Sequence, residues 1–259
     1  MSEQVDSAKL SRPYLAVIVP AYNEAERILP SLERINEYFL AQSYSWEVFV
    51  VSDGSTDGTN DLVNQFAAEH NQFKLIDSKP NRGKGYVVRR GMLEAEADYL
   101  LFSDADLAAP IEEIEKLLPK MDAYDIAIGS RPLKESNLAI RQPWYRERLG
   151  RMANGLIQIC GLRGIKDTQC GFKLFKHSVA KDIFKRCKLD GFSFDFEALM
   201  IARDLNYTIA EVPITWHHVE GSKVVLWRDV PRNLRDLFKL RMIGKQARLS
   251  INPESSQQQ

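Results

Sequence analysis

The sequence has no excess of charge of either sign, few cysteines and no long apolar run. Lysine plus arginine and aspartate plus glutamate number 35 each among 259 residues, so no global charge recruits the chain to nucleic acid or to an anionic membrane. The three cysteines lack CxxC spacing, which favours reduced thiols in a cytosolic protein over a disulfide framework or a zinc site. No segment approaches the roughly 18 apolar residues of a spanning helix. We therefore expect a cytoplasmic protein that binds no nucleic acid.

What the sequence does contain is a regular alternation of short apolar runs and helical patterns. Residues 14–20 and 47–52 are apolar and β-branched without alternation, which is typical of strands buried on both faces of a parallel sheet. The same reasoning places further strands at 74–77, 99–103 and 125–129, and helices at 24–40, 58–70, 83–95, 111–120 and 194–205. This order predicts an α/β fold with a doubly wound, mostly parallel sheet.

The chain divides into one domain with short flanking segments. We expect a flexible N-terminus at 1–12, a catalytic domain at 13–226, an amphipathic C-terminal helix at 227–249 and a disordered tail at 250–259. The segment 227–249 interleaves apolar residues with arginine and lysine, as does a helix that lies in a bilayer interface. Packing of this helix on the domain is an equally weighted alternative.

Polar motifs follow each predicted strand, where the open sheets of this fold class bind their ligands. In chain order the motifs are PAYNE, DGSTDGT, KPNRGKG, DAD and GSR. Two aspartates separated by one residue, Asp104 and Asp106, need a cation to offset their mutual repulsion. Oxygen ligands without histidine or cysteine suit Mg²⁺ or Mn²⁺, although a DxD triplet alone is more often a helix cap.

Two further loops suit a nucleotide. Asp53 lies in the glycine-containing run DGSTDGT and can accept hydrogen bonds from the edge of a uracil or guanine ring, although an ordinary turn uses the same residue types. Gly83 and Lys84 begin a predicted helix and offer backbone N–H groups and a cation to a phosphate. The convergence of base, metal and phosphate ligands at one sheet edge predicts a nucleotide site at the carboxyl ends of the strands.

The motifs VIVPAYNE, VSDGSTDGT, NRGKGYVVRRGM, DAD and GSR, in this order, resemble glycosyltransferase family two with its GT-A fold. The later blocks DTQCGFKLF, FSFDFEAL and EVPITWHHVEGSKV resemble the branch that glycosylates polyprenyl phosphates, in particular the dolichyl-phosphate β-glucosyltransferases. The resemblance covers roughly residues 14 to 226. It implies a metal-dependent, inverting hexosyltransferase, peripheral at the cytoplasmic membrane face, with a polyprenyl phosphate (dolichyl or undecaprenyl) as acceptor.

The resemblance also implies roles for individual residues. Pro20, Tyr22 and Glu24 would line the nucleoside pocket, while Asp53 contacts the base. Asp104 and Asp106 would hold Mg²⁺ or Mn²⁺ on the donor diphosphate. Arginine forks bind phosphate oxygens in two places, so Arg131 and either Arg146 or Arg148 are candidates for the acceptor phosphate. Lys223 resembles a lysine that closes on the donor diphosphate.

The donor and acceptor leave alternatives open. The related mannose synthases usually carry glutamine where this chain has Ala108, which favours UDP-glucose over GDP-mannose. Asp195 or Glu197 is the candidate base if the acceptor is the hydroxyl of a soluble sugar or polysaccharide. A phosphate acceptor is already largely dianionic at neutral pH and needs no base.

Two readings outside this family are less favoured. A sugar-nucleotide nucleotidyltransferase should carry a glycine-rich, basic loop directly after its first strand, and PAYNE is not such a loop. A non-catalytic binding module should have lost one of the two metal aspartates, and both are present.

Overall fold

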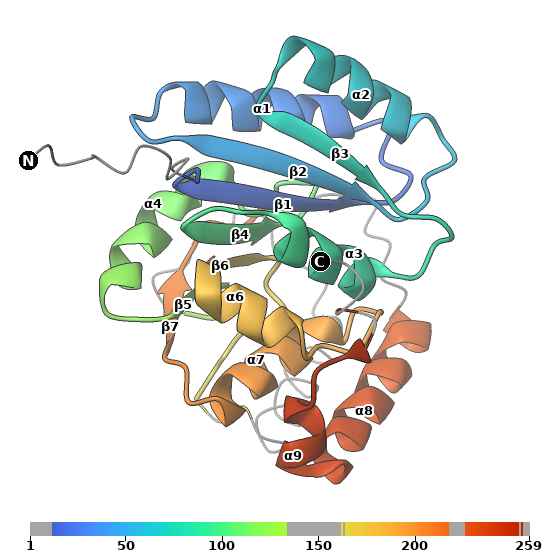
Figure 1. The fold of residues 1–259 in the computed structure, drawn as a ribbon, viewed down its shortest axis with the longest axis vertical. Coiled ribbons are helices and arrows are strands. Elements are labelled where there is room, and N and C mark those ends of the chain that lie inside the picture. The colour runs from blue at the N-terminus through green and yellow to red at the C-terminus, as the bar shows by residue number, and fades with distance from the viewer. Residues whose placement is uncertain (1–11, 134–161, 163, 218–225, 254, 256–259) are drawn as a thin grey trace, which may run out of the picture.

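The computed structural model describes residues 12–133, 162, 164–217, 226–253 and 255. These residues form a seven-stranded sheet in the order β3-β2-β1-β4-β6-β5-β7, with helices on both faces (Figure 1). Every neighbouring pair is parallel except those that involve β6. The strands are β1 (Leu15–Ala21), β2 (Trp46–Ser52), β3 (Phe73–Asp77), β4 (Tyr99–Ser103), β5 (Ile126–Ser130), β6 (Phe172–Lys176) and β7 (Ile209–Pro213).

The helices form two layers. One hydrophobic cluster joins the sheet to α1, α2 and α4, and a second cluster joins the opposite face to α3, α6, α7 and α8. Successive residues of β1 alternate between the two clusters, as the pleat requires. The helices are α1 (Ile28–Leu40), α2 (Thr59–Glu69), α3 (Lys84–Glu94), α4 (Ile114–Leu117, flanked by 3₁₀ turns Ile111–Glu113 and Leu118–Asp122), α6 (His177–Phe184), α7 (Phe194–Asp204), α8 (Leu226–Met242) and α9 (Gly244–Leu249).

The predicted doubly wound, mostly parallel sheet is confirmed, and the strands up to residue 130 lie where the sequence places them. The helix predicted at 24–40 begins only at Ile28, and the helix predicted at 111–120 is α-helical only over Ile114–Leu117, between two 3₁₀ turns. The structure adds β6, α6 and β7, which the sequence analysis did not identify. Strand β6 has the sequence FKLFK, and its buried Lys173 interrupts the apolar run that marks a central strand. Only the neighbouring strands β4 and β5, distant in sequence, define β6 as a strand.

The C-terminal segment differs from expectation in two places. The stretch predicted as one helix at 227–249 is divided into α8 and α9 at Gly244, whose φ of 74° is incompatible with a continuous right-handed helix. The predicted disordered tail is wrong for its first residues, because Asn252 is buried and donates from Nδ2 to the Cys187 carbonyl at 2.8 Å. The expected flexible residues 1–11 lie outside the described residues.

Candidate active site at the carboxyl edge of the sheet

The predicted polar motifs do meet at one edge. Strands β1, β2, β4 and β5 all end there, and the antiparallel β6 begins there, with Phe172 paired to Ser103. The backbone N–H of Asp104 donates to the Gly171 carbonyl at 3.1 Å, which joins the end of β4 to the start of β6. Residues at the ends of five strands therefore lie along one edge of the sheet, although more than a hundred residues of sequence separate the first from the last.

The loops after β1 and β2 hold one another. Asn23, with a left-handed φ of 51°, accepts the Thr56 N–H on Oδ1 at 2.8 Å, and its own N–H donates to Ser55 Oγ at 3.0 Å. The N–H of Glu24 donates to Thr59 Oγ1 at 2.8 Å. These contacts leave Tyr22 with 40% of its surface exposed at the edge. Pro20, which was predicted beside Tyr22 and Glu24, is buried inside β1.

Asp53 organises the neighbouring loop. Its carboxylate is 3% exposed and accepts the N–H of Arg82 on Oδ1 and of Gly83 on Oδ2, both at 2.8 Å. Asn81 Nδ2 donates to the Asp53 carbonyl at 3.0 Å. The loop before α3 is thereby fixed to the end of β2, a function of Asp53 that the sequence analysis did not foresee. Its contact with a nucleobase stays a prediction.

Asp104 and Asp106 follow β4 and face a cation from α3. Lys84 Nζ lies 2.6 Å from Asp104 Oδ1. Burial and the charge of Asp104 raise the pKa of Asp106. Burial lowers the pKa of Lys84, but Asp104 and Asp195 outweigh this and raise it above its ordinary value. The predicted proximity of the two aspartates to the start of α3 is present in the structure.

Gly171 is a site residue that the sequence analysis missed. A Cβ atom at Gly171 would lie 2.0 Å from Asp104 Oδ2, so any side chain there would displace the carboxylate. The signal in the sequence is the glycine of DTQCGFKLF, but nothing local indicates that it packs against Asp104.

Asp195 is held in a buried ion pair. Lys173 Nζ binds Asp195 Oδ1 and also donates to the Cys170 carbonyl at 2.5 Å. Lys173 is 1% exposed and Asp195 is 5% exposed. Burial raises the pKa of Asp195, and Lys173 partly offsets that rise. One of the two carboxylate oxygens of Asp195 is thus already bound to an ammonium group.

Arg131 is anchored beside the same edge. Its Nε and Nη2 bind Asp167 Oδ2 and Oδ1 at 2.6 and 2.9 Å, and 31% of its side chain stays exposed. Burial by itself raises the pKa of Asp167, but Arg131 holds it below its ordinary value. Glu211 of β7 accepts the Asp167 N–H at 2.9 Å and the Ser130 hydroxyl at 2.9 Å. The sequence analysis missed Asp167 and Glu211, whose partners are distant in the chain.

Two predicted site residues, Arg146 and Lys223, lie outside the described residues. Arg148, the alternative to Arg146, also lies outside them.

Comparisons with known proteins agree with this geometry. Residues 16–184 match the model of the glycosyl transferase family 2. The chain is 37% identical to a dolichyl-phosphate β-glucosyltransferase of Saccharomyces cerevisiae, over 88% of this chain and 74% of the relative. It is 31% identical to the human enzyme of the same name, over 88% of this chain and 75% of the relative. The chain belongs to glycosyl transferase family 2.

Solved structures of other glycosyltransferases confirm the GT-A fold. Mannosyl-3-phosphoglycerate synthase from Rubrobacter xylanophilus superposes with a TM-score of 0.67 at 16% identity, covering 93% of this chain and 78% of that chain. Glucosyl-3-phosphoglycerate synthase from Mycobacterium tuberculosis, in complex with Mn²⁺, UDP and glucosyl-3-phosphoglycerate, superposes with a TM-score of 0.64 at 15% identity, covering 88% and 80%. The protein is therefore a glycosyltransferase of α/β architecture.

The residues of this glycosyltransferase fit a divalent cation. Among the described residues, no group of three or more His, Cys, Asp or Glu forms a complete ligand set. Mg²⁺ commonly takes one or two carboxylates and completes its shell with substrate phosphates and water. Asp104 and Asp106 supply two carboxylates, and burial, followed by the negative charge of Asp104, raises the pKa of Asp106.

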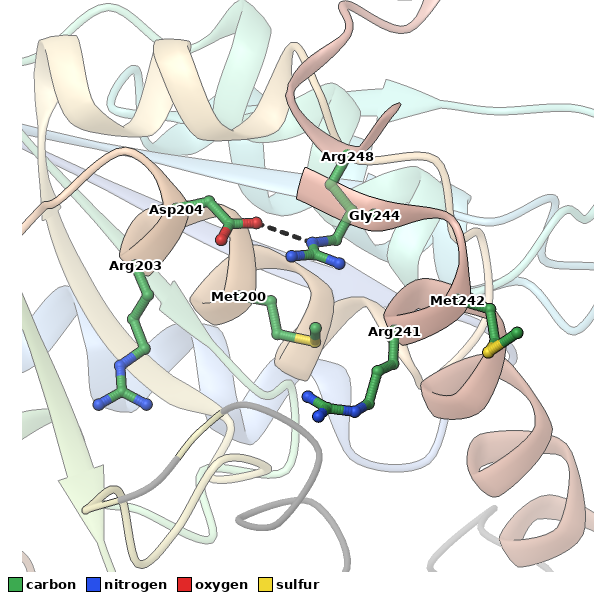
Figure 2. A pocket seen from close by; sticks show the side chains of 7 residues that line it. All are labelled: Met200, Arg203, Asp204, Arg241, Met242, Gly244 and Arg248. Atoms are coloured by element: carbon green, nitrogen blue, oxygen red, sulfur yellow. Dashed lines mark hydrogen bonds and ion pairs between the residues drawn. The ribbon is translucent and has the colours of Figure 1, made fainter. Parts of the chain in front are cut away.

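A cavity of about 480 Å³ lies away from this edge (Figure 2). Its lining comes from the C-terminal end of α7 and from the α8–α9 junction: Met200, Arg203, Asp204, Arg241, Met242, Gly244 and Arg248. Arg248 Nε binds Asp204 Oδ2 at 2.7 Å. Asp195 and Asp204 stand near opposite ends of α7, about 14 Å apart at 1.5 Å per residue. We assign the chemistry to the carboxyl edge, because the aspartate pair and the phosphate loop are there.

Proposed function

We propose that this family 2 enzyme transfers glucose from UDP-glucose to a polyprenyl phosphate with inversion at the anomeric carbon. The observation that supports this most directly is the placement of Asp104 and Asp106 beside Lys84 at the start of α3, where a nucleoside diphosphate can bind. The relatives named dolichyl-phosphate β-glucosyltransferase support the hexose and the acceptor.

The donor occupies the half of the edge formed by β1, β2 and β4. Tyr22 and Glu24, with Pro20 behind them in β1, form the nucleoside side, and Asp53 accepts from the base while it holds the loop before α3. At the start of α3, Lys84 presents its backbone N–H and its ammonium group to the diphosphate, while the Gly83 N–H is bound to Asp53 and fixes the loop that precedes the helix. Asp104 and Asp106 would hold Mg²⁺ or Mn²⁺, which would offset the negative charge of the leaving diphosphate.

The acceptor phosphate lies on the side of β5 and β6. Arg131 holds it by charge, with its fork oriented by Asp167, and Arg146 or Arg148 is a further candidate. Lys223 is a candidate for the donor diphosphate instead. A phosphate oxygen forms the bond to the anomeric carbon while the bond to the donor diphosphate breaks, and the electron pair leaves with the diphosphate. A single displacement of this kind converts an α-linked donor into a β-linked product. Because the acceptor is already an anion, Asp195 need not remove a proton.

The C-terminal helices make the contact with the cytoplasmic face of the membrane. Within the described ranges, every helix is too short or too polar to cross a bilayer. Helix α8 buries Leu237 and Leu240 against the domain, while Phe238 is 53% and Met242 84% exposed. Basic residues surround these exposed apolar groups at Arg235, Lys239, Arg241 and Lys245. Such a face suits an interface rich in anionic lipid. It would bring the catalytic domain 13–226 to the membrane, where its lipid acceptor lies.

The product identifies the reaction. Purified protein is incubated with Mg²⁺ or Mn²⁺, a panel of sugar nucleotides and a short polyprenyl phosphate, and the lipid product is identified by mass and anomeric configuration. We expect a β-linked glucosyl phosphate from UDP-glucose. A mannosyl product from GDP-mannose, or glycosylation only of a soluble sugar, would overturn the donor or the acceptor respectively.

Donor selectivity is tested separately by calorimetric titration with UDP and GDP in the presence of metal. We expect tighter binding of UDP, since Ala108 stands where mannose synthases of the branch carry glutamine. Tighter binding of GDP would favour the mannosyl donor.

A further inference from the structure

A loop between α6 and α7, residues 188–191, packs directly against the first turn of α3. A Cβ atom at Gly83 would lie 2.5 Å from the Asp190 carbonyl oxygen, and one at Gly85 would lie 2.5 Å from the Leu189 carbonyl oxygen. The two backbones therefore touch with no side chain between them. Because neither can move toward the other, the position of loop 188–191 determines where the start of α3 lies.

Asp190 fastens this loop to α3 through side chains as well. Its Oδ2 binds Arg82 Nη2 at 2.9 Å and its Oδ1 binds Arg89 Nη2 at 2.7 Å, while its carbonyl accepts the Tyr86 N–H at 3.2 Å. Arg89 is only 2% exposed, so its partner cannot readily be replaced by water. These contacts lie before the first turn of α3 and within its first two turns.

Glu197 of α7 holds the other side of the loop. It is 1% exposed, and both of its carboxylate oxygens accept the Lys188 N–H at 3.0 Å. Its Oε2 also accepts the Leu189 N–H at 2.8 Å. A buried carboxylate that accepts hydrogen bonds from two consecutive backbone N–H groups fixes the course of the chain. If the carboxylate is removed, the two N–H groups stay buried without an acceptor, which is unfavourable.

We propose that Glu197 is a positioning residue for the donor diphosphate: it holds loop 188–191, and the loop in turn holds Gly83 and Lys84 where the diphosphate binds. The inference rests on the proposed donor site at the start of α3. In this proposal Glu197 contacts neither donor nor acceptor. Its removal therefore weakens donor binding more than it lowers the rate of transfer once both substrates are bound.

Helix α7 supplies a matched control. Asp204, near the far end of the same helix, binds Arg248 of α9, and Lys188 of the loop reaches this region through other groups, the Ala247 carbonyl and Ser250 Oγ. Asp204→Asn removes a carboxylate charge from α7, as Glu197→Gln does, and leaves in place the hydrogen bonds that Glu197 and Asp190 make. A general loss of α7 stability therefore affects both variants, whereas a loss of loop position affects only Glu197→Gln.

The experiment measures binding of UDP with Mg²⁺ by calorimetry and amide hydrogen exchange of the ligand-free protein, for wild type, Glu197→Gln, Asp190→Asn and Asp204→Asn. We expect Glu197→Gln and Asp190→Asn to bind UDP about tenfold more weakly, to exchange faster at 82–86 and 188–191, and to change kcat less than KM. We expect Asp204→Asn to match wild type in all three.

The outcomes separate this inference from the proposed function. If wild type binds UDP and Glu197→Gln binds it equally well, or if its exchange at 82–86 is unchanged, the positioning role is overturned. If wild type binds no nucleoside diphosphate, the proposed donor site fails instead. If Glu197→Gln unfolds, Asp190→Asn still decides between the two outcomes, because Asp190 is partly exposed and lies outside the helix.

Discussion

Two buried carboxylates at the active edge are stabilised in different ways. Asp53, on the donor side, is bound by the backbone N–H groups of Arg82 and Gly83. Asp167, on the acceptor side, is bound by the Arg131 guanidinium. The donor side is thus built from short loops whose backbones fix one another, and the acceptor side from side-chain ion pairs between distant segments. The donor side is organised before ligand binds, whereas the acceptor side depends on single charged residues.

The largest effect should come from the donor side. Asp104→Asn or Asp106→Asn should lower turnover by about a hundredfold to a thousandfold, because the metal that offsets the charge of the leaving diphosphate loses a ligand. Thermal unfolding followed by circular dichroism should stay close to that of wild type, and a chelator should reproduce the loss. Full activity of both variants, or of metal-free enzyme, would falsify the assignment of this pair.

Gly171 links the two sides, since it directly precedes β6 and packs against Asp104. Gly171→Ala should lower turnover on the order of a hundredfold, because the new Cβ would stand 2.0 Å from the Asp104 carboxylate and displace it. Steady-state kinetics at several Mg²⁺ concentrations measure this effect. Gly191→Ala is the control, because a Cβ there meets no atom within 4 Å. Equal activity of the two variants would show that the position of Asp104 is unimportant.

On the acceptor side, Arg131→Ala should cost on the order of a hundredfold in rate. Asp195→Asn should slow the folded enzyme less but destabilise it by roughly 3–5 kcal/mol, because it leaves Lys173 buried without its partner. Urea unfolding measures the stability, and rates are normalised to folded protein. The double variant Lys173→Met/Asp195→Leu should recover stability. If Asp195→Asn is the slower enzyme after normalisation, the acceptor is a hydroxyl and Asp195 is its base.

The smallest effect is a pH dependence of stability. Burial raises the pKa of Glu197 to about 7 from an ordinary value of 4.5. A carboxyl group whose pKa is raised on folding stabilises the protein fully below pH 4.5, and this contribution is lost as the pH rises through 7. The free energy of unfolding of wild type should therefore fall between pH 5 and 8, by up to about 3 kcal/mol relative to Glu197→Gln. Parallel pH profiles of the two proteins would contradict the raised pKa.

Most of the donor side was predictable from the sequence. Parallel strands with continuous apolar runs are recognisable one by one, and their carboxyl ends meet at one edge whatever the details of packing. Motif and position therefore predicted that Asp53, Lys84, Asp104 and Asp106 lie at this edge, and their roles in binding stay predictions. The acceptor side was predicted less completely, because β6 is antiparallel, carries the buried Lys173 and pairs with strands distant in the sequence.

The sequence by itself determined the α/β alternation, the family resemblance and the aspartate pair, since these depend on local pattern and on residues adjacent to strands. The tertiary structure alone decided which charges are paired. Asp195 with Lys173, Arg131 with Asp167 and Glu197 with the 188–189 backbone each join groups that local pattern does not relate. A buried carboxylate needs whatever donor the fold brings to it, and only the folded chain determines which donor that is.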